Sequence, residues 1–230
     1  MSKRLKWIFG LVLAVVIIEE LCLPWLVSSC VTLGMAEILA TERVTVSIEK
    51  RPALAMVAGL FDRIAVKTEN AKVDKINFAE FDVVLTDVKL DAQALIGRRQ
   101  LVVQSAGDAE LTAVLTQEEL SRFLNQAVKG VKNAVVTVSD NQVKVNGDFG
   151  LSGIASVAVT LEGRIIADGQ KIKFVTDRFL INNTLVGKLG GAALTEVVLA
   201  DLKKLPFGVT VRTISMDNGK VTVYADNRVN

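Results

Sequence analysis

Apolar and polar residues alternate along most of this 230-residue chain. In segment 155–165, for example, Val157, Val159 and Leu161 are separated by smaller or polar residues. A period of two is typical of β-strands with one buried face. Between Ile64 and Leu90 the phase of the alternation changes repeatedly, and each change predicts a bulge or a bend, because a slip of one residue turns every side chain to the other face. We therefore expect long, curved antiparallel strands.

Two segments have helical periodicity instead. The first, Thr116–Val131, opens with a capping box formed by Thr116 and Glu119. Its apolar stripe comprises Leu120, Phe123, Leu124, Ala127, Val128 and Val131. A second helix is expected over Leu185–Leu202, with Leu189, Ala193 and Val197 on one face. Helices and antiparallel strands that each have one apolar face predict an α+β fold.

The first 30 residues have a different character. Basic residues at positions 3–6 precede the apolar run Trp7–Ile18, which Glu19 and Glu20 separate from a second apolar patch, Leu21–Val27. This order predicts an uncleaved signal anchor in the cytoplasmic membrane, with residues 31–230 outside it as one domain. Twelve helical residues span about 18 Å of a ~30 Å hydrocarbon core, so the helix should continue past the glutamates and end near residue 40.

Other interpretations of this segment stay open. It could be a cleaved secretory signal, or the sequence VSSC that ends at Cys30 could be a lipoprotein cleavage box with Cys30 lipidated. A buried helix of a cytosolic protein would also be apolar, although the basic leader argues against it. Cys22 and Cys30 would lie about 12 Å apart on a helix, which is too far for a disulfide.

The composition argues against several classes of function. The chain has no histidine, which removes Ser-His and Cys-His nucleophile pairs and histidine metal ligands. A net charge of +2 without long basic runs gives no electrostatic footprint for nucleic acid. Carboxylates such as Asp82 and Asp87 are scattered at positions typical of a solvated surface. We expect a protein that is not an enzyme and needs no cofactor or metal.

The stretch RPALAMVAGLFDRIAV, which starts at Arg51, could be a reactive site or a structural corner. No partner for acid–base chemistry by Asp62 is evident in the sequence, so a corner is favoured. In this interpretation the chain turns at Gly59, and Asp62 and Arg63 stay at the surface, where Asp62 pairs with Arg63 or with the neighbouring strand. The apolar residues before the turn would form a rim close to the groove or the membrane, with Leu54, Met56 and Val57 as contacts.

The predicted interior is aliphatic, because only 5% of the residues are aromatic. Such an interior is either a packed core or a groove for acyl chains, and both need the same residues. A groove would be lined by the inner faces of the two predicted helices and of the strand at 155–165. Its lining residues would be Leu120, Phe123, Leu124, Ala127, Val128, Val157, Val159, Leu161, Leu189, Ala193 and Val197.

Four motifs occur in an order that resembles the bacterial LmeA-like phospholipid-binding family: LPWLVSSCVTLGMAEIL, VTVSIEKRPALAMVAGLFDRIAVKTENAKV, AELTAVLTQEELSRFLN and LPFGVTVRTISMDNGKVTVYA. Arg51 departs from the family pattern, which has an aromatic or apolar residue before the proline. The resemblance implies a TULIP-like fold, a long curved antiparallel sheet wrapped around amphipathic helices. It also implies binding of phospholipid or another acyl lipid in the cell envelope, with lipid transfer or envelope-lipid assembly as the role. A non-enzymatic envelope scaffold with a filled core is the alternative.

Overall fold

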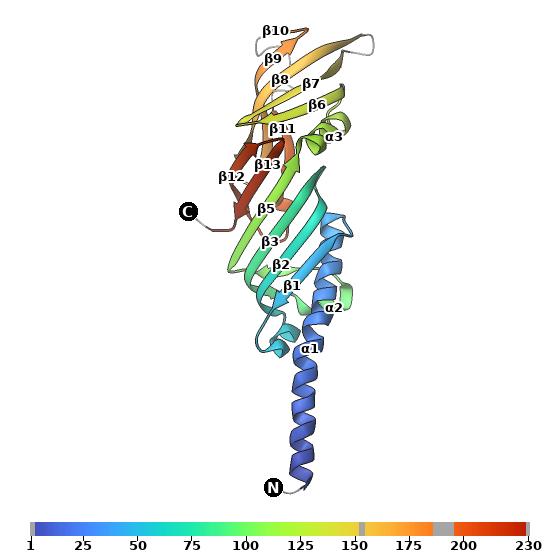
Figure 1. Ribbon diagram of the computed structural model, residues 1–230, viewed down its shortest axis with the longest axis vertical. Coiled ribbons are helices and arrows are strands. Elements are labelled where there is room, and N and C mark those ends of the chain that lie inside the picture. The colour runs from blue at the N-terminus through green and yellow to red at the C-terminus, as the bar shows by residue number, and fades with distance from the viewer. Residues whose placement is uncertain (1–2, 152–154, 186–195, 229–230) are drawn as a thin grey trace.

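The computed structural model describes residues 3–151, 155–185 and 196–228, and its longest element is helix α1 (Lys3–Leu39). The N-terminal half of α1 extends away from the rest of the molecule, whereas its C-terminal half packs against strands (Figure 1). Val27, Val31, Met35 and Leu39 recur every four residues, and each is at most 4% exposed. Helix α1 therefore crosses residue 30, the expected boundary between anchor and body, without interruption.

The first sheet has seven strands in the spatial order β1-β2-β3-β5-β13-β12, with β4 paired to the end of β3. All of these pairings are antiparallel. The strands are β1 (Val44–Glu49), β2 (Leu60–Val73), β3 (Ile76–Leu90), β4 (Val103–Ser105), β5 (Asp108–Thr116), β12 (Thr210–Asp217) and β13 (Lys220–Asp226).

Strands β2 and β3 bend together at two points along their length, near Asn70 and near Asp87. The buried residues of β3 change phase after Phe78 and again after Leu85. The register between the two strands stays constant across both points, where Asn70 of β2 and Asp87 of β3 have positive φ angles of 56° and 48°. The phase changes in the sequence therefore mark bends shared by paired strands, and these bends curve the sheet.

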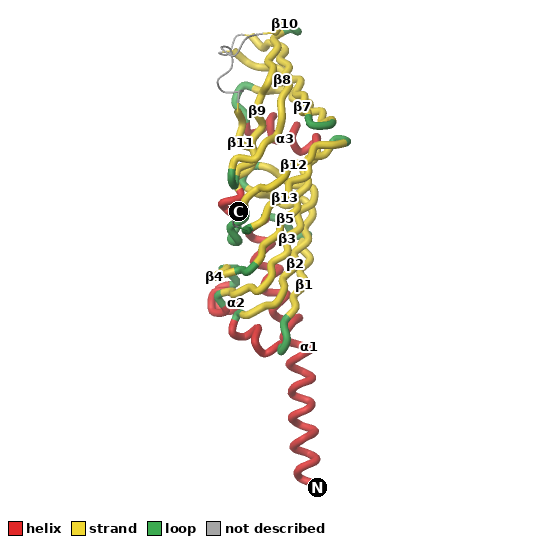
Figure 2. Tube along the Cα trace, turned by 90° about the vertical axis from the view of Figure 1, so that its left-hand side faces the viewer, coloured by secondary structure: helices red, strands yellow, loops and turns green. Residues whose placement is uncertain are grey.

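The second sheet has six strands in the order β10-β9-β8-β7-β6, with β11 paired to β9. It follows the first sheet along the long axis of the molecule (Figure 2). Helix α3 (Gln117–Ala127) connects β5 to β6 and packs against the second sheet. The strands are β6 (Val131–Ser139), β7 (Gln142–Leu151), β8 (Ala155–Asp168), β9 (Lys171–Ile181), β10 (Thr184–Leu185) and β11 (Glu196–Asp201).

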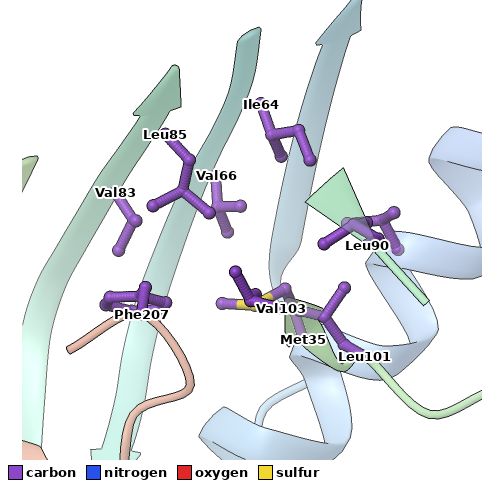
Figure 3. Close-up of a pocket in the computed structure, with 10 residues that line it drawn as sticks. Met35, Ile64, Val66, Val83, Leu85, Leu90, Leu101, Val103 and Phe207 are labelled. Atoms are coloured by element: carbon purple, nitrogen blue, oxygen red, sulfur yellow. The ribbon is translucent and has the colours of Figure 1, made fainter. Parts of the chain in front are cut away.

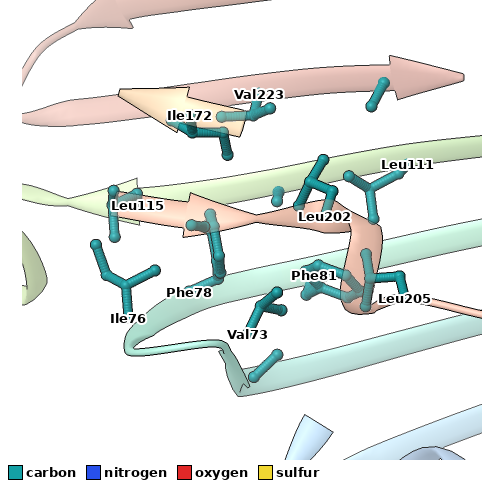
Figure 4. Close-up of a cluster of buried hydrophobic side chains, with 14 of the residues drawn as sticks. Val73, Ile76, Phe78, Phe81, Leu111, Leu115, Ile172, Leu202, Leu205 and Val223 are labelled. Carbon is teal, nitrogen blue, oxygen red and sulfur yellow. The ribbon is translucent and has the colours of Figure 1, made fainter. Parts of the chain in front are cut away.

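The two sheets share one apolar core. At their junction the Gly219 N–H donates to the Val138 carbonyl over 3.1 Å, and the Val211 N–H donates to the Gly169 carbonyl over 3.0 Å. The turn η3 (Leu202–Lys204) and the residues after it cross from the second sheet to the first. There Leu202 and Leu205 lie over residues of β3 and β5 such as Phe81 (Figure 4). The buried cluster consequently continues from α1 to α3.

Two short helical elements lie beside α1. The 3-10 helix η1 (Ala53–Ala58) follows β1, and helix α2 (Ala92–Arg98) follows β3. After α2, residues 99–102, the strap, lead into β4. A Cβ atom added at Gly34 of α1 would lie 3.0 Å from Cβ of Leu101, so glycine allows the strap to approach α1 closely.

The α+β prediction is confirmed, and the final hairpin, the helix after Thr116 and the apolar turn ending at Gly59 are where the sequence indicated them. The helix expected over Leu185–Leu202 is wrong for its last third. Residues 196–201 form strand β11, which pairs with β9 at the edge of the second sheet. Leu199 and Ala200 are both buried there beside a register shift, so the spacing of apolar residues imitates a helix.

Candidate functional site

Helix α3 is capped at its N-terminus by Thr116 and is attached to the second sheet near its C-terminus by Asn125. The Thr116 side chain caps it by accepting a hydrogen bond from the Glu119 N–H over 3.3 Å. Glu119 pairs with Arg122 instead of completing the predicted capping box. Asn125 binds Ala134 of β6 twice, because its Oδ1 accepts from the Ala134 N–H at 2.8 Å and its Nδ2 donates to the Ala134 carbonyl at 2.9 Å.

An apolar cavity lies between α3 and the second sheet. Its volume is about 10 Å³, close to that needed by a single water molecule. Every side chain that lines it is apolar: Leu120, Leu124, Val136, Val143, Val145, Ile165, Phe174 and Leu199. Such a lining offers no hydrogen bonds, so it suits hydrocarbon rather than a polar ligand.

The apolar inner face of the second sheet continues beyond this cavity. Val145, Leu161 and Phe179 form a row across β7, β8 and β9, and Phe149 pairs with Val157 further along. Leu161 is buried, whereas Phe149, Val157 and Phe179 are half-buried. The face is therefore dry beneath α3 and becomes accessible along β7 and β8 away from it.

The structure brings most of the predicted groove residues to this face. Leu120, Phe123 and Leu124 of α3 are buried, as are Val159 and Leu161 of β8. The half-buried members of the predicted set are Val128, Val157 and Val197.

Two helix positions differ from the prediction, and two cannot be placed. Ala127 is exposed, because α3 ends there, and Val131 begins strand β6 instead of continuing the helix. Leu189 and Ala193 lie outside the described residues.

Several lining residues were not predicted, although the signal for them is present. Val143 and Val145 of β7 alternate with polar neighbours, and Val136 of β6 shares the period of two with Ala134 and Val138. Alternation alone shows that a residue faces inward. Which inward residues surround a cavity depends on where α3 crosses the sheet, and that is a tertiary property.

The first sheet encloses a second small cavity, also of about 10 Å³. Met35 of α1 faces Val66 and Val83 of the sheet, and Leu101 and Val103 close the space from the strap side (Figure 3). Val31 of α1 also lines the cavity. Phe207, from the segment before β12, covers the end. The protein's own helix and strap thus fill the groove of the first sheet, and they leave the second sheet as the more accessible half.

The turn η1 with Gly59, here called the foot, is the corner predicted around Asp62. Gly59 has a φ of 77°, and a Cβ atom there would lie 2.2 Å from the Leu90 carbonyl oxygen, which excludes any other residue without rearrangement. The Asp62 carboxylate accepts hydrogen bonds from Lys50 Nζ at 2.7 Å and from the Arg51 N–H at 3.1 Å. These two bonds lower the pKa of Asp62 below its usual value near 3.8.

The foot divides the three predicted rim residues. Leu54 and Val57 are 57% and 50% exposed, whereas Met56 is 3% exposed and belongs to the core. The expectation that Met56 contacts the membrane is therefore corrected. In a 3-10 helix, side chains three residues apart share one side, so Met56 joins Ala53 on the inner side.

The described residues carry charge only outside the two cavities. Both linings are made of apolar side chains, and no group of three or more His, Cys, Asp or Glu that could hold a metal ion is found in the described part of the chain. Cys22 and Cys30 are free thiols, as their spacing predicted. The chemistry available to this interior is the burial of hydrocarbon.

Comparison with known proteins gives a single positive result. No curated protein and no solved structure matches the chain significantly. A family model described as LmeA-like phospholipid-binding matches residues 19–226, from the glutamates of α1 to the last residue of β13. Because this match covers most of the 230 residues, the chain belongs to the LmeA-like phospholipid-binding family.

Proposed function

We propose that this protein is a membrane-tethered, extracytoplasmic phospholipid-binding protein of the bacterial cell envelope. Its second sheet would hold the acyl chains, in support of lipid transfer or envelope-lipid assembly. The observation that carries the proposal is the uninterrupted apolar face that runs from the cavity beneath α3 to the half-buried Phe149, Val157 and Phe179. Burial of each acyl CH₂ group on such a face contributes about 0.8 kcal/mol.

A bound acyl chain requires this interior to expand. A cavity of about 10 Å³ is far smaller than the roughly 300–1,000 Å³ of a typical ligand pocket. In this proposal a lipid would enter by displacing α3 or its neighbours from the sheet. Because Asn125 fixes α3 to β6, the bonds of that side chain would oppose opening.

Helix α1 would hold the protein in the membrane. Among the described residues, one helix is long and apolar enough to cross a bilayer, and the window that qualifies is Cys22–Leu39. The stripe from Val27 to Leu39 packs in the core, however, so the bilayer would surround the part of α1 that extends away from the body (Figure 1). The basic residues at positions 3–6 favour a cytoplasmic N-terminus.

We further propose that α1 is retained in the mature protein. Cleavage before Cys30 would divide the helix within its packed stripe and remove Val27 from the core. It would also remove the hydrogen bond from Ser28 Oγ to the Val46 carbonyl, 3.0 Å long. Cys30 itself packs partly against the core, which opposes its use as a lipidated N-terminus.

Lipid capture by two matched variants tests the proposal. The full chain in detergent is mixed with vesicles of phosphatidylcholine and phosphatidylglycerol, reisolated, and examined for bound lipid by native mass spectrometry. Val136→Phe fills the cavity beneath α3, whereas Val135→Phe adds the same group at a neighbouring position that is 60% exposed. We expect bound phospholipid in the wild type and in Val135→Phe, and a several-fold loss in Val136→Phe, with thermal unfolding showing that all three are folded.

A scaffold with a filled core is the second candidate, and the small volume of both cavities favours it. Such a protein would bind another protein through its surface and would hold no lipid. Absence of phospholipid from the folded wild-type chain would support the scaffold. Equal amounts of bound phospholipid in the two variants would contradict an acyl-binding site beneath α3.

A further inference from the structure

The foot has an apolar side that the fold leaves uncovered. Within η1, Ala53 and Met56 face the core at 1% and 3% exposure, while Leu54 and Val57 are 57% and 50% exposed. Residues three apart in a 3-10 helix share one side, so Leu54 and Val57 form a single outward apolar ridge. Leu60, the first residue of β2, is 40% exposed and follows directly after Gly59.

Glu20 fixes the level of the foot along α1. Its carboxylate accepts a hydrogen bond from the Ala53 N–H, over 3.2 Å, at the start of η1. This contact satisfies a backbone donor at the entrance of the foot. It gives the acidic side chain of Glu20 a structural role within the otherwise apolar N-terminal half of α1.

The two tryptophans of the chain are both exposed on α1, at a spacing close to the thickness of a bilayer. Trp7 and Trp25 are 82% and 73% exposed. Eighteen helical residues separate them by about 27 Å, close to the ~30 Å hydrocarbon thickness, and tryptophan favours both membrane interfaces. Glu20 lies five residues before Trp25, about 7.5 Å further toward the N-terminus, and Glu20 holds the start of the foot.

We propose that the foot inserts into the outer leaflet beside α1, with Leu54 and Val57 at the boundary between headgroups and acyl chains. This inference rests on the membrane anchoring in the proposed function, and it adds that the body is seated in the bilayer rather than suspended above it. Insertion to this depth is what interfacial apolar elements achieve, about 5–10 Å below the surface. Next to the foot, Lys50 forms an ion pair with Asp62, and the Arg51 backbone N–H donates to the same carboxylate.

Tryptophan scanning in the full chain tests the seating. Trp7→Phe leaves Trp25 as the single emitter, and three further variants carry one tryptophan each, at Leu54, Val57 or Val135, with Trp7 and Trp25 both replaced by Phe. All three positions are exposed, so the larger ring fits without repacking. The proteins are reconstituted into phosphatidylcholine vesicles that contain lipid brominated close to the headgroup end of the acyl chain.

We expect Leu54→Trp and Val57→Trp to be quenched to about the same extent as Trp25 and shielded from aqueous iodide. Val135→Trp, on the outer side of β6, should show the opposite behaviour. Quenching of Trp25 by bromine together with iodide access at both foot positions would overturn the inserted foot while leaving the anchor intact. Absence of quenching at Trp25 would instead contradict the anchor itself, and with it the foot.

Discussion

At the scale of single residues, Asp62 shows how a group that resembles a catalytic carboxylate can be structural. It lies between a lysine and a backbone N–H at the start of β2, and Lys50 supplies the larger part of the pKa depression, followed by Arg51. Both partners stabilise the ionised form of the carboxylate. The sequence indicated the surface pairing correctly, with the neighbouring strand as one of two candidate partners.

This pairing predicts a pH-dependent contribution to stability. Because the native pKa of Asp62 is below the unfolded value, its stabilisation is present above about pH 4 and is lost as the pH falls through the native pKa. Asp62→Asn should therefore lower the urea midpoint slightly at pH 7, and the difference from wild type should shrink toward pH 3. Denaturation in one detergent at both pH values measures this.

Asp140→Asn is the matched control for that measurement, because Asp140 lies at the β6–β7 turn without a side-chain hydrogen bond or ion pair to any described residue. Its substitution should leave the difference between the two pH values unchanged. A midpoint for Asp62→Asn that equals wild type at pH 7 would contradict a stabilising role for the pair with Lys50.

At the scale of elements, the sequence predicted the features that depend on neighbouring residues. The cap at Thr116, the turn at Gly59 and the bent pair β2–β3 each follow from residues within a few positions of one another. Strand β11 and helix α2 were not predicted, because their form depends on distant partners. Helix α2 packs beside α1, more than 50 residues earlier in the chain, and β11 exists through its pairing with β9.

The attachment of α3 to β6 supplies a prediction at this scale. Asn125→Ala removes two hydrogen bonds to Ala134 and leaves its buried N–H and carbonyl without these partners, so we expect the free energy of unfolding to fall by about 1–3 kcal/mol. Gln126→Ala, at the next and exposed position, should change it by less than about 0.5 kcal/mol. Chemical denaturation of the two variants measures the difference, and equal losses would show that Asn125 does not hold the helix.

The same contact links stability to the proposed opening of the interior. If α3 must move for an acyl chain to enter, loosening it should promote lipid uptake while it lowers stability. Asn125→Ala is then expected to take up vesicle phospholipid faster than Gln126→Ala. Slower uptake by Asn125→Ala would indicate that the lipid enters without movement of α3.

At the scale of the whole molecule, the protruding half of α1 and the accessible apolar face lie at opposite ends. Helix α1 and the foot form one end, and strands β7 to β10 form the other (Figures 1 and 2). The first sheet is closed by α1 and the strap, while the second sheet has the half-buried Phe149 and Val157. An envelope protein of this shape would present its lipid site away from the bilayer that holds it.

The alternation of apolar and polar residues predicts which residues lie on the inner face. It does not distinguish a packed core from a lipid-binding groove. Val159 and Leu161 would alternate in the same way in either case, since both environments exclude water. That choice depends on three tertiary features. They are the position of α3 over the second sheet, the packing of α1 into the groove of the first sheet, and the volume of the cavities that remain. The direct way to decide it is to place a lipid inside.

Photo-crosslinking from an acyl chain is the measurement that does so. The full chain is reconstituted with phosphatidylcholine that carries a diazirine near the end of one acyl chain, irradiated, and mapped by peptide mass spectrometry. We expect crosslinks on inward residues around the cavity beneath α3, such as Leu124, Val136 and Val145, in addition to those on α1. Crosslinks confined to α1 and the foot, with none on α3 or the inner face of the second sheet, would contradict acyl binding in the interior.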